Sequence, residues 1–421
     1  MANSIAETFP TAPTVPANRG WIVTFAGTGI NLALGVLYTW SLFKGAIEKE
    51  FGWKGDQLND PYALCCLVFA FVMILAGRCQ DKWGPRLTAS IGGLLVGAGM
   101  VLISQTRSYA LWLLGFGVMV GAGIGFGYSS ATPPALKWFP PNKTGLIAGL
   151  VVAGFGLAPV YLAPTSQYLL AHFGLQKSML ILGVAFVVIV CGLAQLLVNP
   201  PPGVVTGPKP AAGTSPAAAA VNAVPAEILR QPTFWLLWSI YFIGAGAGLM
   251  VIGSISGMAK NSMGDLAFLA VAILAIGNAG GRILAGTLSD RIGRRQTLAL
   301  VLAFQAVLMF VAIPVTASRS TAAAVVVLVA ALIGANYGAN LSLFPSFTKD
   351  LWGLKNFGMN YGVLFTAWGV GGLVLPRLQQ TLTARSSGSY TTSFITAGVL
   401  LLLGAALTFL IKPPPPKTAP A

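Results

Sequence analysis

Long apolar stretches make up most of this chain, and short polar or charged segments separate them. A stretch of roughly 20 apolar residues with few charges is typical of a helix that crosses a membrane, because its length matches the hydrocarbon core. Twelve such helices are predicted, at residues 21–43, 62–76, 87–105, 110–133, 145–170, 178–198, 233–253, 267–288, 297–316, 321–343, 358–378 and 391–411. The pattern therefore predicts an all-α membrane protein.

A short charged segment occurs twice between these stretches. Gly77 to Arg86 lies between the second and third predicted helices, and Gly286 to Arg295 lies between the eighth and ninth. The first Gly, the Asp, the second Gly and the final Arg each recur 209 positions later (286 − 77), about half of the 421 residues. A repeat at half the chain length predicts two pseudo-symmetric bundles of six helices, as in many secondary transporters.

The stretch between the two predicted bundles is rich in Pro, Gly, Ala, Ser and Thr, which is typical of a flexible or partly extended linker. The expected organisation is a disordered tail at 1–18, an N-terminal bundle at 19–198, a linker at 199–231, a C-terminal bundle at 232–411 and a second tail at 412–421.

Composition and charge agree with a membrane location. Charged residues make up only 8% of the chain, against roughly 25% in soluble domains. The net charge of +15 is spread thinly, so a nucleic-acid partner is not expected. With both termini placed in the cytoplasm, cytoplasmic segments carry 15 Lys and Arg and external loops carry 9. This bias predicts a multi-pass protein of the cytoplasmic membrane with both termini inside.

The remaining basic residue, Arg282, lies inside an apolar stretch with Asn278 one turn before it. A guanidinium at membrane depth costs roughly 2.5–3.5 kcal/mol even on the permissive scales. One interpretation is that Arg282 reaches out to the cytoplasmic interface. The interpretation that we favour is a binding site for a carboxylate, which a guanidinium holds with two parallel hydrogen bonds.

All ten acidic residues fall in loops, tails or helix ends, so an anion is the expected substrate. The four cysteines lack zinc-ligand spacing, and the predicted helices contain no cluster of His, Cys or acidic residues. We therefore expect no metal, no cofactor and no enzymatic activity. Aromatic and amide side chains can line a cavity around an anion, although each is equally compatible with core packing. The candidates are Tyr38, Trp40, Tyr128, Phe155, Asn336, Tyr337, Tyr361 and Trp368.

Asp81, Arg86, Asp290 and Arg295 of the repeated segment are candidates for a gate. Carboxylates surrounded by basic residues at helix ends can hold two bundles together on one side and release them on the other. The alternative is that the basic residues only keep these loops in the cytoplasm during insertion, and the two roles are compatible.

The repeated segment Gly-x3-Asp-x2-Gly-x-Arg resembles the signature loop of the major facilitator superfamily. Residues 35–43, 137–140 and 233–238 resemble the branch that holds the oxalate–formate antiporters and the monocarboxylate transporters. The resemblance implies the superfamily fold, with anion binding between the halves. It assigns Arg282 as the substrate arginine and implies a lining that includes Tyr38, Tyr128, Phe155 and Tyr337.

Two positions depart from the resembled proteins. Trp368 stands where the oxalate–formate exchangers have a Lys, and a single cation suits a monoanion better than the dianion oxalate. Asn278 stands where animal monocarboxylate transporters have an Asp. A proton symporter would therefore need another titrating group, or would take up the proton with its substrate.

The function predicted from the sequence is secondary transport of small monocarboxylates, lactate-like or pyruvate-like, by alternating access. An oxalate–formate type of organic anion antiporter is the alternative, and proton symport, anion exchange and uniport all stay open. An efflux pump for amphipathic compounds and a membrane receptor are less favoured, because an embedded acid and a soluble output domain are missing from the sequence. The expected partners are the anion, a coupled proton or counter-anion and the lipid bilayer, and the expected functional unit is a monomer.

Overall fold

The computed structural model describes residues 18–201, 222–252, 267–317 and 322–412, and in these ranges all of the regular secondary structure is helical. The helices are α1 (Arg19–Leu34), η1 (Gly35–Thr39), α2 (Trp40–Phe51), α3 (Asp56–Trp83), α4 (Pro85–Ser104), α5 (Tyr109–Trp112), η2 (Leu113–Val120), α6 (Gly121–Lys137), η3 (Pro141–Lys143), α7 (Thr144–Ala194), α8 (Pro225–Leu229), α9 (Pro232–Ile252), α11 (Ala267–Ile292), α12 (Arg294–Ala317), α13 (Ala323–Trp352), α14 (Phe357–Arg385) and α15 (Thr391–Thr408).

Within these ranges, ten helical segments are long and apolar enough to cross a membrane. One of them contains α7, which spans 51 residues and breaks at Gly174, where φ is 70° and ψ is 177°. The part before Gly174 packs on α1 and α11, and the part after it packs on α4, so α7 holds two of the expected spans. With the 26-residue α11, each of the twelve expected spans has a counterpart.

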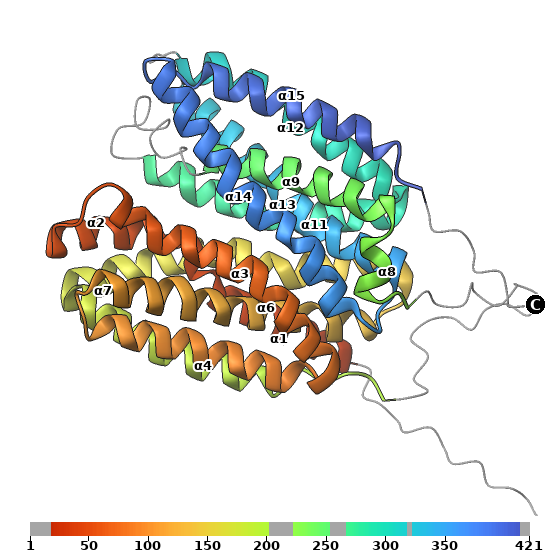
Figure 1. Cartoon of the computed structure of the whole chain (residues 1–421), viewed down its shortest axis with the longest axis horizontal. Helices are drawn as coiled ribbons and strands as arrows, with labels where there is room; N and C mark the ends of the chain where they lie inside the picture. The colour runs from red at the N-terminus through yellow and green to blue at the C-terminus, as the bar shows by residue number, and fades with distance from the viewer. Residues whose placement is uncertain (1–17, 202–221, 253–266, 318–321, 413–421) are drawn as a thin grey trace, which may run out of the picture.

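The chain forms two halves that lie side by side (Figure 1). Helices α1 to α7 form one half and α9 to α15 form the other, and the main packing between them joins α3 to α14 and α7 to α11. The twelve-helix fold in two halves that the repeat predicts is therefore confirmed.

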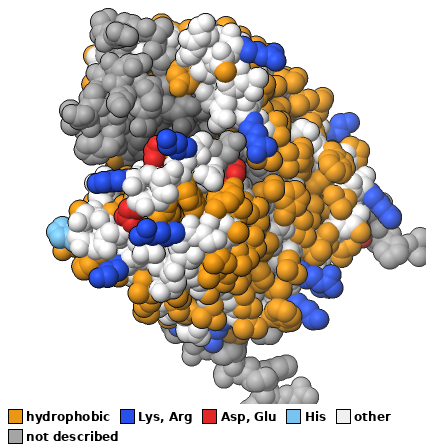
Figure 2. All heavy atoms as spheres, turned by 60° about the vertical axis from the view of Figure 1, so that its left-hand side comes forward, with side chains coloured by type: hydrophobic (Ala, Val, Ile, Leu, Met, Phe, Trp, Pro, Cys, Tyr) orange, Lys and Arg blue, Asp and Glu red, His pale blue; other side chains and the backbone are white. Residues whose placement is uncertain are grey.

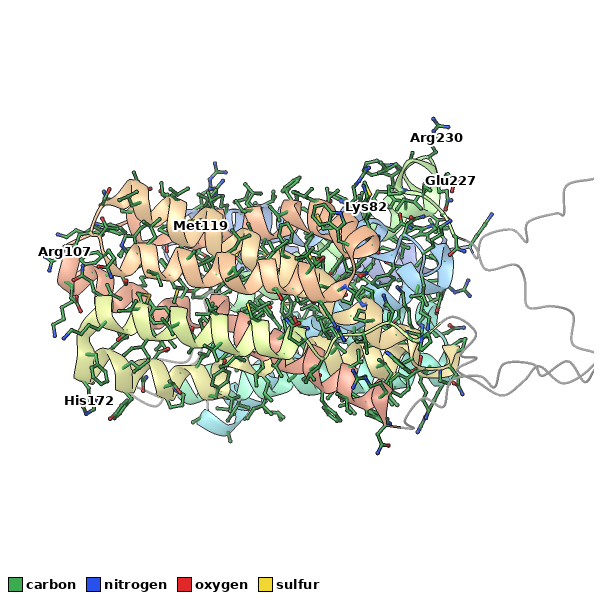
Figure 3. The ribbon with its side chains drawn as sticks, turned by 90° about the horizontal axis from the view of Figure 1, so that it is seen from below. Lys82, Arg107, Met119, His172, Glu227 and Arg230 are labelled. Atoms are coloured by element: carbon green, nitrogen blue, oxygen red, sulfur yellow. The ribbon has the colours of Figure 1, made fainter. Side chains whose placement is uncertain are left out.

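The surface of the helices is apolar where lipid would contact it. Large side chains such as Leu284, Val188 and Phe409 are 71%, 67% and 66% exposed, and Figure 2 shows a broad hydrophobic surface along the flank. Figure 3 places Arg107 and His172 at one end of the bundle, Lys82, Glu227 and Arg230 at the other, and Met119 between them. We call these the α2 end and the α8 end, after the short helix at each (Figure 1).

The helices extend beyond the apolar stretches that predicted them. The stretch 62–76 belongs to α3, which runs from Asp56 to Trp83 and includes most of the first charged segment. The turn after it is a single residue, Gly84, with φ 88°, and the turn of the second copy is Gly293, with φ 95°. A positive φ favours glycine, which explains why the second Gly recurs in both copies.

The linker is described only in part. The tails at 1–17 and 413–421 and the linker residues 202–221 lie outside the described residues. Its last part is ordered on the C-terminal half, because the Ala223 amide donates to the Trp352 carbonyl and the Ala223 carbonyl accepts from Asn356 and Asn360. The expectation of an extended linker therefore does not extend to residues 222–231, which include α8.

Candidate functional site

Arg282 lies in the middle of α11 and is completely buried. Its Nε donates a hydrogen bond of 2.9 Å to Oδ1 of Asn278, one turn earlier on the same helix. Arg282 is the one charged side chain that is fully buried in the described part of the chain. The interpretation that Arg282 reaches out to the membrane interface is therefore wrong for this conformation.

The guanidinium of Arg282 also reaches the other half of the molecule. Its Nη1 donates to the backbone carbonyl of Val152 on α7. Room for this contact comes from Gly156, one turn later on α7, because a Cβ at that position would lie 3.1 Å from both Arg282 Nε and Asn278 Oδ1. The buried cation thus lies directly between the two halves.

The hydrogen-bonding capacity of this guanidinium is not filled. Among the described residues, Nη2 of Arg282 is buried without a hydrogen-bond partner, and no Asp or Glu forms an ion pair with the side chain. A buried cation without a counter-charge is strongly destabilising unless something negative or polar joins it. The group is therefore suited to receive a small anion.

Aromatic residues of both halves surround Arg282. The Tyr38 hydroxyl lies 2.9 Å from the Tyr337 hydroxyl, which also accepts a 2.9 Å hydrogen bond from Nε1 of Trp368. The ring of Phe155 contacts those of Tyr38 and Tyr128 edge to face, at centroid distances of 5.2 and 5.5 Å. The phenols of Tyr38 and Tyr128 lie close enough to the Arg282 guanidinium to interact with it electrostatically.

These contacts bring the sequence candidates for binding together at one place. Arg282 and Asn278 come from α11, Tyr38 from η1, Tyr128 from α6, Phe155 from α7, Tyr337 from α13 and Trp368 from α14. Their roles in binding stay predictions. Trp40 lies elsewhere, since its Nε1 donates to the Leu58 carbonyl and its ring packs 4.4 Å from that of Phe116.

Four further aromatic residues belong to the same cluster. The ring of Phe365 on α14 lies 5.1 Å from Phe69, 5.5 Å from Tyr128, 6.1 Å from Tyr241 and 5.6 Å from Tyr361. Of these, sequence reasoning identified Tyr128 and Tyr361 and missed Phe69, Tyr241 and Phe365. Helices α3, α9 and α14 are apolar on most faces, so their sequences do not tell which aromatic points inward.

Both aspartates of the repeated segments accept hydrogen bonds from backbone amides of the opposite half. Asp81, near the end of α3, accepts hydrogen bonds of 3.0 Å from the amides of Gly358 and Met359, in the first turn of α14. Asp290, near the end of α11, accepts from the amides of Gly145 and Leu146 in the first turn of α7, at 2.8 and 2.9 Å. Each carboxylate satisfies the free amides of a helix N-terminus, where a negative charge is also favoured by the helix dipole.

The first glycine of each copy permits these contacts. A Cβ at Gly286 would overlap the carbonyl oxygen of Gly145, and a Cβ at Gly77 would overlap that of Gly358. The two halves therefore meet backbone to backbone at the α8 end. In this conformation they are closed at that end by two symmetric contacts.

Unlike the two aspartates, the two arginines predicted for the gate have exposed side chains. Arg86 is exposed, and its Nε donates to the Leu197 carbonyl within its own half, at 3.2 Å. Arg295 is exposed as well. The neighbouring Arg294, which sequence reasoning missed, pairs with Asp290 at 2.6 Å and with Asp350 at 2.9 Å.

Two lysines occupy corresponding places beside these aspartates. Lys137 ends α6 and interacts with the charge of Asp81. Lys349, in the last turn of α13, donates 2.5 Å to Oγ1 of Thr144 at the start of α7 and interacts with the charge of Asp290. The lysines are 212 positions apart (349 − 137), close to the spacing of the repeat.

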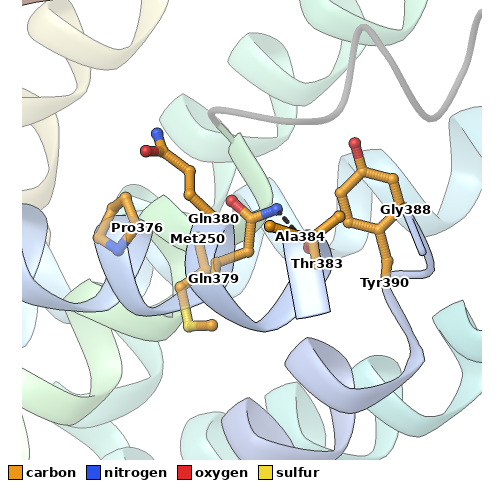
Figure 4. A pocket seen from close by; sticks show the side chains of 8 residues that line it. All are labelled: Met250, Pro376, Gln379, Gln380, Thr383, Ala384, Gly388 and Tyr390. Carbon is orange, nitrogen blue, oxygen red and sulfur yellow. Dashed lines mark hydrogen bonds between the residues drawn. The ribbon is translucent and has the colours of Figure 1, made fainter. Parts of the chain in front are cut away.

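A pocket of about 410 Å³ lies away from this site, towards the α2 end of the C-terminal half (Figure 4). Met250, Pro376, Gln379 and Tyr390 are among its lining residues. Gln379 donates a hydrogen bond of 3.3 Å to Thr383 within this pocket. In the described ranges, no three His, Cys, Asp or Glu side chains are grouped so that they could hold a metal ion.

Long apolar helices in two similar halves, with a buried cation between them in the described part of the chain, are typical of membrane transporters. A family model of the Major Facilitator Superfamily matches residues 21–376 and 264–421, and the chain belongs to that superfamily. It is therefore a membrane transport protein and not an enzyme.

Known relatives cover most of the chain. It is 31% identical to the uncharacterized MFS-type transporter YhjX of Escherichia coli, over 84% of this chain and 86% of that protein. It is 28% identical to the oxalate:formate antiporter of Oxalobacter formigenes, over 94% and 92% of the two chains. It is 25% identical to human monocarboxylate transporter 11, over 92% and 81%.

Solved structures agree on the fold. The fucose transporter FucP in an outward conformation superposes with a TM-score of 0.66 over 94% of this chain and 99% of that one, at 15% identity. This likeness supports the arrangement of the helices and carries no information on the substrate.

Proposed function

We propose that this protein transports small monocarboxylate anions across the cytoplasmic membrane by alternating access, with Arg282 as the binding group for the carboxylate. The observation that carries the proposal is the unpartnered Nη2 of a fully buried arginine located between the two halves. A carboxylate would accept two hydrogen bonds from the guanidinium and would neutralise its charge.

The surroundings of Arg282 favour a small anion with an apolar part. The rings of Phe69, Phe155 and Phe365 contribute apolar surface, and the hydroxyls of Tyr38 and Tyr128 contribute a few polar groups. Apolar walls with a small number of placed polar groups are the usual composition of a small-molecule site. The named activity of monocarboxylate transporter 11 fits this composition.

Organic anion antiport of the oxalate–formate type is the second candidate, and similarity to the antiporter of Oxalobacter formigenes favours it. Charge argues against oxalate as the preferred substrate. Trp368 stands at the position where a second cation is expected for such an exchanger, and its indole donates a hydrogen bond to the Tyr337 hydroxyl. In the described part of the chain, Arg282 would then face both carboxylates of a dianion without a second buried cation.

The contacts of Asp81 and Asp290 support a gating role at the α8 end. Both carboxylates bind helix N-termini of the opposite half, so breaking these contacts is required before the halves can separate there. The excess of Lys and Arg in the segments at this end supports a cytoplasmic location for it and for both termini. Because the α8 end is held closed, the halves would have to separate at the α2 end to admit substrate to the buried Arg282.

Purified protein in proteoliposomes tests the proposal. We expect uptake of labelled lactate or pyruvate that Arg282→Ala abolishes, with oxalate as a weak competitor. Uptake with and without a pH gradient, and with each anion preloaded inside, separates proton symport from exchange and from uniport. Full activity of Arg282→Ala at normal protein amounts would contradict the proposal.

A further inference from the structure

Three tyrosines near Arg282 have hydroxyl groups that the fold leaves without a partner. The hydroxyls of Tyr128, Tyr241 and Tyr361 are buried and, within the described residues, have no hydrogen-bond partner. Tyr337, in the same cluster, differs because its hydroxyl is bonded to both Tyr38 and Trp368. Among the described tyrosines, these three are the ones whose buried hydroxyls lack a partner, and we call them the tyrosine triad.

The triad is assembled from three helices of both halves. Tyr128 lies on α6 of the N-terminal half, and Tyr241 on α9 and Tyr361 on α14 belong to the C-terminal half. Their rings surround Phe365 at centroid distances of 5.5, 6.1 and 5.6 Å. Tyr361 is near enough to Tyr128 and Tyr241 for the hydroxyls to interact, although no pair has the geometry of a hydrogen bond.

The triad also faces the buried cation. The charge of Arg282 acts on the phenols of Tyr128 and Tyr241, and Tyr361 lies next to both. A buried hydroxyl without a partner destabilises a protein, whereas phenylalanine would fill the same space without that penalty. Three such hydroxyls at one place, beside an arginine that also has a free donor, form a set of groups that a ligand can satisfy together.

We propose that the tyrosine triad is a second polar subsite, which binds an oxygen atom of the substrate other than those of its carboxylate. The inference rests on the proposed function and adds a specificity rule to it. The substrate is a monocarboxylate that carries a hydroxyl or oxo group, with the carboxylate on Arg282 and the additional oxygen on the triad. An acid of the same size without that oxygen leaves the three hydroxyls unsatisfied and binds less well.

The rule can be tested with three acids of nearly equal size. Lactate carries a hydroxyl, pyruvate carries an oxo group, and propionate has neither. Uptake of each acid into proteoliposomes is measured for the wild type, Tyr241→Phe and Tyr361→Phe. The readout is the kcat/KM for lactate and for pyruvate, each divided by the kcat/KM for propionate. Tyr168→Phe, an exposed tyrosine at the α2 end beside His172, is the matched control.

We expect the wild type to prefer lactate or pyruvate over propionate by at least about tenfold, which corresponds to one ordinary hydrogen bond. Tyr241→Phe and Tyr361→Phe should each reduce this preference by roughly tenfold by lowering lactate or pyruvate uptake. Propionate uptake should be unchanged in these variants and in Tyr168→Phe. Thermal unfolding shows whether the variants are as stable as the wild type, as removal of an unsatisfied hydroxyl predicts.

Two other results lead to different conclusions. Transport of all three acids that depends on Arg282, with the same preference in the wild type and both Phe variants, would overturn the subsite and leave the proposed function intact. Failure of the wild type to carry any of the acids, or uptake that does not depend on Arg282, would overturn the proposed function and the subsite with it.

Discussion

Asp290 near the end of α11 accepts a hydrogen bond of 2.8 Å from the backbone amide of Gly145, the second residue of α7 in the opposite half. The first copy of the repeat makes the corresponding contact, from Asp81 to Gly358. Two symmetric contacts between a carboxylate and a helix N-terminus therefore close the α8 end of the molecule. The similar packing of the two halves at this end accounts for the occurrence of the same charged segment twice.

These contacts predict that neutralising either aspartate alters conformational exchange. In Asp81→Asn and Asp290→Asn an amide replaces the carboxylate, so one of the two bonded amides of the opposite helix loses its acceptor and the helix dipole loses its counter-charge. We expect transport to slow by roughly tenfold or more with substrate affinity nearly unchanged, since a charged hydrogen bond contributes about 1.5–3 kcal/mol. Uptake rates and binding to purified protein measure the two effects separately.

Glu48→Gln at an exposed position of α2 is the matched control for the aspartate variants. It removes the same charge from a helix that lies at the other end of the molecule. A parallel loss of affinity and rate in the aspartate variants would assign these residues to binding and not to gating.

Adjacent arginines allow a sharper test of the same contact. Arg294 pairs with Asp290 and Asp350, whereas Arg295 is exposed. Arg294→Ala should therefore reproduce most of the defect of Asp290→Asn, and Arg295→Ala should transport nearly as the wild type does. Uptake assays on the two variants measure this difference. A larger defect in Arg295→Ala than in Arg294→Ala would support Arg295, the residue that the repeat pattern selects, as the gating arginine.

The backbone contact between the halves gives a further prediction. A methyl group at Gly286 would overlap the carbonyl oxygen of Gly145, while a Cβ at Gly280 on the same helix meets nothing within 4 Å. Gly286→Ala should therefore prevent closure at the α8 end and strongly reduce transport, and Gly280→Ala should not. Normal uptake in Gly286→Ala, in protein whose thermal stability matches the wild type, would show that this close approach is not needed.

The docked end of the linker predicts an effect on stability. Asn360 is buried on α14 and donates 2.9 Å to the Ala223 carbonyl, one residue after the Met359 amide that binds Asp81. Asn360→Ala leaves that carbonyl with fewer partners and should lower the free energy of unfolding by about 1–3 kcal/mol. Thermal or denaturant unfolding measures this change, with the exposed Asn59→Ala near the α2 end as a control whose stability should change less.

Much of this organisation is readable in the sequence because two of its signals are strong. A charged segment repeated after 209 residues predicts two halves, and one arginine in an apolar stretch without any acid points to a place for an anion. Both signals depend on residue types that are expensive in a membrane, so they rarely occur without a reason.

Other features depend on which way a side chain points, and the apolar helices do not encode this in a simple pattern. Tyr241 lies on α9, which is apolar on nearly all faces, so periodicity does not distinguish it from a lipid-facing aromatic. The choice of Arg294 over Arg295 depends on the turn at Gly293, whose φ of 95° sets the direction of the helix that follows. Such a direction follows from three-dimensional packing and not from the spacing of residues.

Replacement of Arg282 by lysine should strongly reduce transport even though the positive charge is kept. Nε and Nη1 already donate to Asn278 and Val152, and the guanidinium still offers a carboxylate further N–H groups in one plane, including those of Nη2. Arg282→Lys places a single ammonium there, which cannot reproduce the planar set of donors. We expect uptake to fall by roughly 100-fold, as expected when a charged hydrogen bond of about 3 kcal/mol is lost.

Arg385→Lys, at an exposed position near the end of α14, is the control for this substitution and should transport normally. Uptake in Arg282→Lys equal to that of the wild type would mean that charge alone holds the substrate.

The contacts of Trp368 lead to a prediction about whether the transporter prefers monoanions or dianions. Its indole donates to the Tyr337 hydroxyl and its ring packs 5.0 Å from that of Phe365, so this position adds an apolar wall and no charge. A monocarboxylate leaves the site near neutral with Arg282, whereas oxalate brings a second charge whose burial costs several kcal/mol even after relaxation. We therefore expect lactate or pyruvate to compete with labelled substrate far better than oxalate does.

Trp368→Lys should shift this preference towards the dianion, because the new ammonium lies where the second carboxylate needs a partner. Trp368→Phe is the matched control, since it removes the indole donor without adding charge and should leave the preference for monoanions in place. Competition assays with oxalate, lactate and pyruvate on the three proteins measure the change. Oxalate that binds more tightly to the wild type than every monocarboxylate would contradict the single-cation argument and would favour the oxalate–formate type of exchange.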